Sequence, residues 1–255
     1  MFQGQNARMT KPLRDFFKWL AEPVLVAGLM FVATTAIAQP FYVPSGSMEP
    51  TLQIGDVMLG SKFAYGYSRW SVPHGIGPVS ETRLFGKMPK RGDVVIFRLP
   101  RNPRETLVKR LIGLPGDRIQ MVHGRLIINE KPVPLSDAGV GKVEEESGRW
   151  REIARYTETL PGGVKHPIFK RGWDGVLDDT PVFIVPAGHL FMMGDNRDNS
   201  MDSRVAAEDG GVGFVPVANL MARADLMVGS YDYLNAHSLK DWLGQIRLSR
   251  FLRAI

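Results

Sequence analysis

Two serines in a short, turn-like stretch are the first candidates for chemistry in this sequence. The stretch VPSGSMEPTLQIGD covers residues 43 to 56 and places Ser45 and Ser47 on either side of Gly46. Ser, Gly and Pro are ordinary turn residues, and Ser47 could cap a helical turn, so a structural role is the simplest interpretation. The 255-residue chain contains no Cys, which excludes a thiolate nucleophile, disulfides and Cys-ligated zinc. Any nucleophile must therefore be another side chain, and a serine hydroxyl is one candidate.

A lysine in the apolar stretch TLVKRLIGLPGD is a candidate base. In a strand, Leu107, Lys109 and Leu111 would share one face, while Arg110 would lie on the other. Periodicity does not say which cation is buried, but an arginine stays charged whereas a lysine between leucines can lose its proton. Lowering a lysine pKa from about 10.4 to between 7 and 8 requires about 4 kcal/mol, which burial can supply. The alternative is an exposed cation on an edge strand.

A third polar stretch, MMGDNRDNSMDSR, covers residues 192 to 204. It predicts a loop held by hydrogen bonds and ion pairs, in which Asp202 and Arg204 are two residues apart and Asp195 is free to meet Arg110. A calcium loop is an alternative. Its liganding positions would be Asp198, Ser200, Asp202 and Asp209, but Ser203 stands where that loop needs glycine, and its last position lacks Glu.

A serine hydrolase that uses histidine is a further alternative. The chain offers five histidines, and His189 is the one nearest in sequence to the polar segment: His74, His123, His166, His189 and His237. No G-x-S-x-G elbow surrounds either serine, and the α/β pattern that this elbow requires is absent. Serine paired with lysine is the remaining variant of the nucleophile-and-base arrangement.

The N-terminal region predicts a membrane segment. The net charge of +6 and pI near 9.6 fit nucleic acid or an anionic membrane, and the lack of a nucleic-acid motif favours the membrane. Arg8, Lys11, Arg14 and Lys18 precede an uncharged run over 24–38. This segment is an anchor or a cleavable signal peptide, since Ala36-Ile37-Ala38 has the small-x-small pattern of a cut site. Both interpretations place the remainder across the membrane.

Beyond Gln39, short apolar runs broken by Gly, Pro and Asp predict a mostly β protein. The predicted strands lie over 55–63, 92–100, 106–114, 124–133, 181–186 and 189–195. Residues 64–90 are expected to form an extended loop or ribbon. The polar residues 135–180 are expected to form an insertion or a loosely built subdomain.

Taken together, PSGSMEPTL, GDVVIFRLP with TLVKRLIGLPGD, and GDNRDNSMDSR resemble the motifs of bacterial type I signal peptidases, the membrane-anchored serine proteases that remove signal peptides from exported preproteins. The resemblance runs with gaps over residues 44–226. Three motifs in the family's order make it specific. It differs at VAAEDGGVGFVP, which is longer than the usual connection, and in having one predicted membrane segment where many members have two.

The resemblance implies a role for each matching residue. Ser47 corresponds to the nucleophile and Lys109 to the general base, while the Ser45 hydroxyl and the Ser47 backbone N–H form the oxyanion hole. Ser200 corresponds to a serine that hydrogen-bonds the lysine. Four further residues correspond to those that hold the site in shape: Asp202, Arg204, Asp195 and Arg110. No metal and no cofactor are implied.

The resemblance also implies an antiparallel β-sheet catalytic core with an inserted, smaller β subdomain and one N-terminal transmembrane helix. The expected division is a cytoplasmic basic N-terminus (1–15), an uncut anchor (16–38), a β core in two parts (39–117 and 187–235), the inserted subdomain (118–186) and a basic apolar tail (236–255). Within the tail, a break near Arg247 and loose membrane contact are expected, the alternative being a frayed terminus.

The expected enzyme lies in the bacterial inner membrane, with its catalytic domain on the periplasmic side, and cleaves exported preproteins after small-x-small sites. Its partners are preproteins and phospholipid, without nucleic acid. Two alternatives are a related Ser-Lys processing peptidase, such as one that processes conjugal pilin, and a non-catalytic anchored β domain that binds a protein or calcium.

Overall fold

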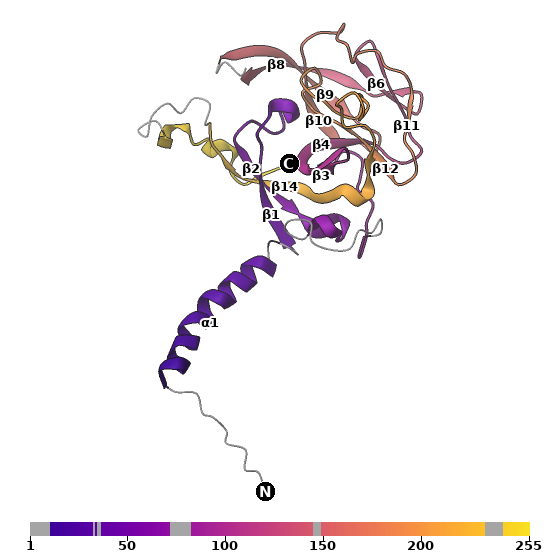
Figure 1. Ribbon diagram of the computed structural model, residues 1–255. Helices are drawn as coiled ribbons and strands as arrows, with labels where there is room; N and C mark the ends of the chain where they lie inside the picture. Colours follow the sequence, from indigo (N-terminus) through magenta and orange to yellow (C-terminus); the bar gives the residue numbers. More distant parts are fainter. Residues whose placement is uncertain (1–10, 33, 35–36, 72–82, 145–148, 233–241) are drawn as a thin grey trace.

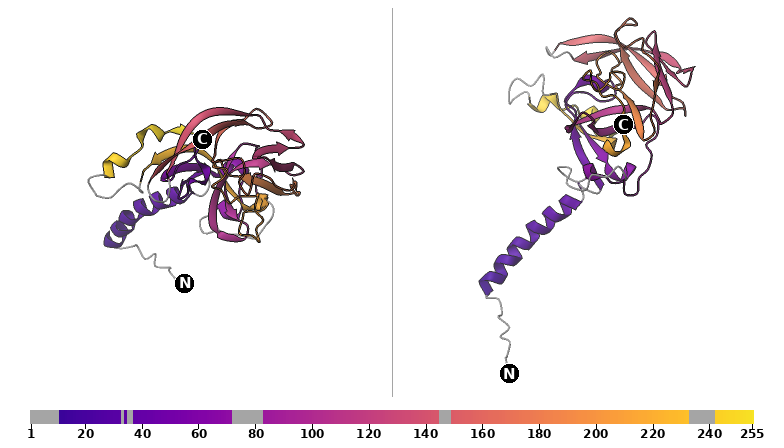
Figure 2. Two further views of the ribbon diagram at one scale, coloured as in Figure 1. Left: turned by 90° about the horizontal axis from the view of Figure 1, so that it is seen from above. Right: turned by 45° about the vertical axis from the view of Figure 1, so that its right-hand side comes forward.

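The computed structural model of the chain describes residues 11–32, 34, 37–71, 83–144, 149–232 and 242–255. It confirms a mostly β, antiparallel fold. One long helix, α1 (Lys11–Val32), precedes the strands and extends away from the β structure (Figure 1). Two further views show the same separation (Figure 2).

The largest sheet has eight strands. Its order is β1-β2-β14-β3-β4-β12-β13, and β15 pairs with β14. The bounds are β1 (Ala38–Tyr42), β2 (Asp56–Ser61), β3 (Val94–Leu99), β4 (Asn102–Gly113), β12 (His189–Met193), β13 (Val215–Pro216), β14 (Leu220–Ser230) and β15 (Arg253–Ala254).

Two smaller sheets lie at the end of the molecule remote from α1 (Figure 1). The first has the order β10-β9-β8, and the second has the order β11-β5-β6-β7. Their bounds are β5 (Arg118–Val122), β6 (Arg125–Ile128), β7 (Lys131–Pro132), β8 (Leu135–Glu144), β9 (Trp150–Thr159), β10 (Lys165–Lys170) and β11 (Phe183–Ile184). Both sheets come from residues 118–186, but the division of the chain into subdomains stays a prediction.

Apolar clusters cover both faces of the largest sheet near β3 and β4. Val95 and Phe97 pack in one cluster with Leu111, whereas Val94 and Ile96 pack in another with Met48. Burial on both faces explains why β3 reads as a continuous apolar run without alternation. It also places β4, and therefore Lys109, in the interior of the sheet.

The other helices given for the described residues are single 3-10 turns. They are η2 (Gly46–Met48), η3 (Lys62–Tyr65), η4 (Arg69–Ser71), η6 (Val217–Asn219), η7 (Trp242–Gln245) and η8 (Leu248–Arg250). The expected loop over 64–90 thus contains helical turns and a β-bridge between Tyr67 and Leu84, and its residues 72–82 lie outside the described part.

The end of the chain packs against the largest sheet, so a frayed terminus is wrong for residues 242–255. Arg250 pairs with the buried Asp56 at 2.6 Å, and Arg247 donates to Ser230 Oγ at 2.8 Å. The strand β15 then pairs with β14. These anchors explain why the tail forms two short turns and a strand. Its predicted start, residues 236–241, is not among the described residues.

The N-terminal helix presents apolar side chains to its surroundings. Its exposed large apolar residues are Phe16, Trp19, Leu20, Val24, Leu25, Val26, Leu29, Met30, Phe31 and Val32. The helix begins at Lys11, before the start of the anchor predicted over 16–38, and it ends at Val32, before the end of that anchor. Over the described ranges, no helix has both the length and the apolar character needed to cross a membrane. Of the possible cut site, Ala36 lies outside the described residues, whereas Ala38 pairs with Ser61 in β1.

Candidate active site

The turn η2 presents Ser47 between β1 and β2. Met48 and Leu52, which are fully buried, anchor this turn in the core. Within the turn the Glu49 N–H donates to the Gly46 carbonyl at 3.1 Å, and the Leu52 N–H donates to the Met48 carbonyl at 3.0 Å. The apolar residues that follow Ser47 therefore fix the backbone, which leaves the half-buried serine hydroxyl at the surface of the core.

Asn196 holds the same turn from the opposite side. Its backbone N–H donates to the Ser47 carbonyl at 3.1 Å, and its side-chain Nδ2 donates to the Gly46 carbonyl at 3.1 Å. Sequence reasoning missed this residue. The signal available was its position in the polar segment 192–204, where an amide can donate to a backbone carbonyl.

Lys109 reaches Ser47 from the middle of β4. The Lys109 Nζ and Ser47 Oγ atoms are 2.5 Å apart, and the lysine is only 4% exposed. Because β4 lies between β3 and β12, the alternative of an exposed cation on an edge strand is wrong. The structure therefore brings together the two residues that were predicted to act as a pair.

Burial lowers the pKa of Lys109 to about 8. The negative charges of Asp202 and Asp195 act in the opposite direction, and the positive charge of Arg204 adds to the lowering. Near this pKa a substantial fraction of the lysine is neutral close to physiological pH. A neutral amine at hydrogen-bond distance from a hydroxyl can accept its proton.

Ser45 lies directly before the turn. Its backbone is extended (φ −135°, ψ 150°), its side chain is exposed, and its Oγ atom is 3.4 Å from Ser47 Oγ. Gly46 between the two serines is buried, and a Cβ atom there would lie 2.7 Å from a carboxylate oxygen of Glu49. Glycine therefore allows the close approach of the Glu49 carboxylate to the turn.

Arg110 and Asp195 form a buried pair beside the site. Arg110 donates to both carboxylate oxygens, at 2.8 and 2.6 Å, and also to the Gly92 carbonyl at 2.7 Å. Thr51 donates to Asp195 Oδ2 at 2.5 Å. Burial alone would raise the pKa of Asp195, but the Arg110 charge outweighs it and the pKa is lowered. The pair accounts for the burial of Arg110, whereas the buried Lys109 contacts Ser47.

Asp202 and Arg204 form a second buried pair. Arg204 Nε donates to Asp202 Oδ1 at 2.9 Å, and the Gly194 N–H donates to Asp202 Oδ2 at 3.0 Å. Arg204 also donates to the Arg197 carbonyl at 2.7 Å. The pKa of Asp202 is lowered because Arg204 outweighs the effect of burial. This pair closes the polar segment into a compact loop.

Ser200 lies in this loop, but its expected hydrogen bond to Lys109 is not made. The Ser200 Oγ atom is buried and has no hydrogen-bond partner among the described residues. It packs instead against Gly194, where an added Cβ atom would collide with it and would lie 2.5 Å from the Ser47 carbonyl oxygen. The Lys109 amine contacts Ser47 instead.

A third buried pair was not predicted. Arg197 donates to Glu158 at 2.9 and 2.5 Å, and His166 Nε2 lies 3.4 Å from Glu158 and 3.8 Å from Asp195. Glu158 comes from β9, far from the polar segment in sequence, so spacing alone gave no signal for it. Burial would raise the pKa of Glu158, but Arg197 outweighs burial and lowers the pKa to about 2.

The other interpretations of these residues find less support. His189 Nδ1 lies 2.9 Å from the Ala187 carbonyl, whereas Ser47 Oγ contacts Ser45 and Lys109. Asp198, which a calcium loop would use, is paired with Lys170 at 2.5 Å. No cluster of three metal-ligating acids or histidines occurs in the part of the chain that the structure describes.

The family model that matches this chain and two of its curated relatives all represent signal peptidases. Residues 16–229 match the family model described as signal peptidase, peptidase S26. The signal peptidase I of Rickettsia canadensis is 36% identical, with 85% of each chain covered. The signal peptidase I of Rickettsia typhi is 33% identical, with 97% of this chain and 96% of the relative covered.

A solved structure gives a more limited match. The crystal structure of a signal peptidase I from Enterococcus faecalis V583 is 26% identical, covers 54% of this chain and 97% of that chain, and superposes with a TM-score of 0.31. The family assignment rests on the sequence matches. This chain belongs to the signal peptidase family, peptidase S26.

Proposed function

We propose that this chain is a serine endopeptidase that removes signal peptides from exported preproteins, with Ser47 as the nucleophile and Lys109 as the general base. One observation carries the proposal: a buried lysine with a lowered pKa lies 2.5 Å from a half-buried serine hydroxyl. Membership of the signal peptidase family supports exported preproteins as the substrates. We propose that the enzyme cleaves them after small-x-small sites.

The acylation step follows from this contact. Ser47 Oγ attacks the scissile carbonyl carbon and transfers its proton to the neutral Lys109 amine. When the C–N bond breaks, Lys109 returns that proton to the leaving nitrogen, which leaves the signal peptide esterified to Ser47. Lys109 then takes a proton from a water molecule, whose oxygen attacks the ester carbon. When the ester C–O bond breaks, Lys109 returns this proton to Ser47 Oγ, and the signal peptide leaves with a new C-terminal carboxyl group. One group thus serves as base and acid in turn.

The oxyanion of each tetrahedral intermediate requires donors in front of Ser47. We assign this role to the Ser47 backbone N–H and the Ser45 hydroxyl, whose oxygen lies 3.4 Å from Ser47 Oγ. Donors held in place before the reaction stabilise charge that develops only in the transition state. The exposure of Ser45 is consistent with access by a peptide.

Cleavage of a purified preprotein by the full-length protein in detergent tests the proposal. Wild type is expected to cut after the small-x-small site with or without a chelator, while Ser47→Ala and Lys109→Met abolish cutting. The exposed Lys87→Met is a matched control that should retain activity. Cleavage that depends on a divalent metal, or that survives Ser47→Ala in a correctly folded protein, would overturn the Ser47/Lys109 assignment. A correctly folded wild type that cuts no preprotein would favour the non-catalytic β domain that binds a protein or calcium.

We also propose that the segment 16–38 anchors the enzyme in the bacterial inner membrane, with the catalytic domain on the periplasmic side. The cations Lys11, Arg14 and Lys18 precede exposed apolar side chains along α1, which supports this orientation. Alkaline extraction of membranes should leave the full chain in the pellet. N-terminal sequencing of that protein would contradict an uncut anchor if the chain began at Gln39.

A further inference from the structure

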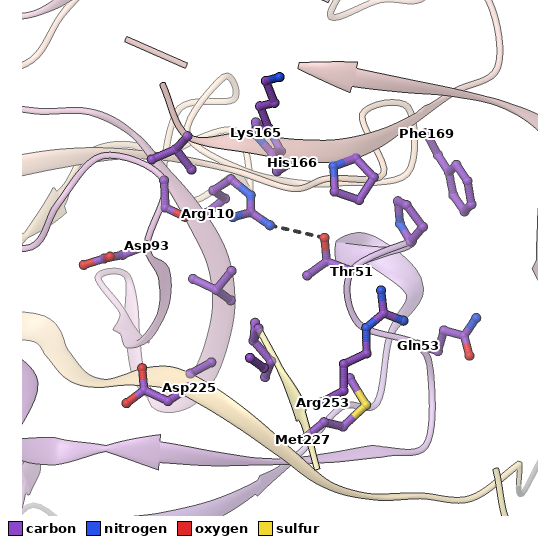
Figure 3. Close-up of a pocket in the computed structure, with 18 of the residues that line it drawn as sticks. Thr51, Gln53, Asp93, Arg110, Lys165, His166, Phe169, Asp225, Met227 and Arg253 are labelled. Carbon is purple, nitrogen blue, oxygen red and sulfur yellow. Dashed lines mark hydrogen bonds between the residues drawn. The ribbon is translucent and has the colours of Figure 1, made fainter. Parts of the chain in front are cut away.

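A cavity lies on the far side of the Arg110–Asp195 pair from Ser47 and Lys109, with Thr51 and Arg110 in its lining. Its volume is about 810 Å³, and neither Ser47 nor Lys109 lines it. One wall comes from β10, with Lys165 and His166, and the opposite wall carries Thr51, Gln53 and Arg253 (Figure 3). The cavity therefore lies between the β8–β10 sheet and the largest sheet.

Unpaired cations gather around this cavity. Five lining side chains form no ion pair in the described part of the chain, and they come from separate segments: Lys90, Lys142, Arg155, Lys165 and Arg253. The four other lining arginines are paired with aspartates: Arg91 with Asp117, Arg110 with Asp195, Arg223 with Asp225 and Arg250 with Asp56. Like charges repel, so five converging cations without counterions favour an anionic ligand.

The two lining aspartates do not neutralise this excess. Asp225 is paired with Arg223 at 2.5 Å. Asp93 accepts hydrogen bonds from the Tyr65 hydroxyl at 3.0 Å and from the Lys90 backbone N–H at 2.9 Å. Both carboxylates thus have local partners, and the cationic side chains on the other segments stay available.

A buried ring nitrogen without a hydrogen-bond partner points to the same ligand. His166 lines the cavity and is only 3% exposed; its Nε2 atom faces the Glu158 carboxylate at 3.4 Å, whereas its Nδ1 atom has no hydrogen-bond partner among the described residues. Buried polar atoms are normally satisfied, so an unsatisfied ring nitrogen on a residue of the cavity wall indicates a missing partner. A ring N–H there can donate to an anion held by the surrounding cations.

We propose that this cavity binds an anion that carries phosphate groups. Lysine and arginine are the usual partners of phosphate oxygens, and arginine can bind them in a bidentate manner. The number of unpaired cations favours a ligand with more than one negative charge. The cavity volume leaves room for further atoms, so a free compound with two phosphates and the headgroup of an anionic lipid share the required chemistry.

The test uses the full-length protein, inorganic pyrophosphate and paired variants at constant ionic strength, because surface electrostatics depend on salt. Calorimetry should show saturable pyrophosphate binding that Lys165→Gln/Arg253→Gln weakens about tenfold or more, as expected for loss of two charge-assisted contacts. A second pair, Lys142→Gln/Arg155→Gln, should weaken it similarly. Lys131→Gln/Arg104→Gln removes the same charge from exposed positions outside the cavity and should change nothing.

A second arm identifies the source of the phosphate. Binding to phosphatidylcholine vesicles is compared with binding to vesicles that also contain phosphatidylglycerol. If the cavity variants bind only the phosphatidylglycerol vesicles more weakly than wild type does, and pyrophosphate does not bind, the ligand is a lipid headgroup. If the cavity variants lose pyrophosphate binding but bind both kinds of vesicle as wild type does, the ligand is a free compound. Equal behaviour of cavity and control pairs in both arms, or tighter binding of an oligoglutamate peptide than of pyrophosphate, would overturn the proposal. Preprotein cleavage by the cavity variants stays a separate readout, so this result is independent of the Ser47 assignment.

Discussion

The backbone N–H of Asn196 donates to the carbonyl oxygen of Ser47 at 3.1 Å, which ties the polar segment directly to the turn that carries the nucleophile. The Asn196 side chain adds a second bond, to the Gly46 carbonyl. The orientation of Ser47 therefore depends on a residue 149 positions later in the chain. This relationship makes Asn196 a positioning residue for the proposed reaction.

Replacing Asn196 with Ala should lower kcat about tenfold with little change in KM, because the turn loses one of two bonds that orient Ser47. The free energy of unfolding should fall by about 1 kcal/mol or somewhat more, as for a buried hydrogen bond. Asn219→Ala is a matched control, since it removes one side-chain bond to a carbonyl at 3.0 Å away from the site. A similar loss of kcat in the control would show that Asn196 has no specific role.

The activity of the enzyme should rise with pH through about 8. The pKa of Lys109 is lowered to about 8, and only the neutral amine can accept the proton of Ser47. The neutral fraction increases as the pH rises through this pKa. Asp202 raises this pKa, so Asp202→Asn should move the rise in kcat/KM to lower pH. The profile of kcat/KM from pH 6 to 10 measures the shift. Asp137→Asn, an exposed position in β8, should leave the profile unchanged, and an upward shift for Asp202→Asn would contradict the base assignment.

Ser45→Ala should lower kcat about 100- to 1000-fold, with KM nearly unchanged, because one donor to the oxyanion is lost. Ser45→Thr keeps a hydroxyl and should retain most of the activity. Ser136→Ala, an exposed serine in β8, controls for loss of a hydroxyl elsewhere. A Ser45→Ala enzyme that kept wild-type kcat would remove Ser45 from the oxyanion hole.

Gly194→Ala should reduce activity at least about tenfold, because the new methyl group would meet the Ser47 carbonyl oxygen at 2.5 Å and collide with Ser200 Oγ. The double variant Gly194→Ala/Ser200→Gly removes the collision with the Ser200 side chain, whose Oγ and Cβ atoms both meet the new methyl group, and leaves the collision with the Ser47 carbonyl. It should recover thermal stability but not kcat, since the Ser47 carbonyl still has to move. Gly229→Ala, where the nearest side-chain atom is 3.7 Å away, should have neither effect. Full recovery of kcat in the double variant would show that the Ser47 backbone is not displaced.

Features of the fold that depend on short-range sequence patterns could be predicted from the sequence. The apolar run 94–99 predicted β3, and the alternation around Lys109 placed Leu107 and Leu111 in one cluster and Val108 in another, as observed. Asp195 was also expected to be free to meet Arg110, and the two side chains form an ion pair at 2.6 Å.

Contacts between distant segments could not be read from spacing. The bonds of Asn196 to the turn of Ser47, and of Arg197 to Glu158, depend on how β9, β10 and the polar segment meet, which the chain pattern does not encode locally. The same holds for the basic cavity, whose cations come from separate segments. The predicted bond from Ser200 to Lys109 failed for a related reason, because the tight approach at Gly194 turns that hydroxyl elsewhere.

Glu158→Gln should destabilise the protein by about 3 to 5 kcal/mol at pH 7, because it leaves the Arg197 charge buried without its partner. The folded pKa of Glu158 is lowered to about 2 from an ordinary 4.5, so its stabilising effect is complete above about pH 4.5 and is lost as the pH falls toward 2. The difference in free energy of unfolding between wild type and Glu158→Gln should therefore shrink below pH 4.5. Thermal unfolding in detergent between pH 3 and 7 measures it. Glu130→Gln, whose side chain is 82% exposed beside Arg118, should show no measurable difference at any pH. A difference for Glu158→Gln that stays constant down to pH 3 would mean that the Glu158 carboxylate is not stabilised by Arg197 in the folded protein.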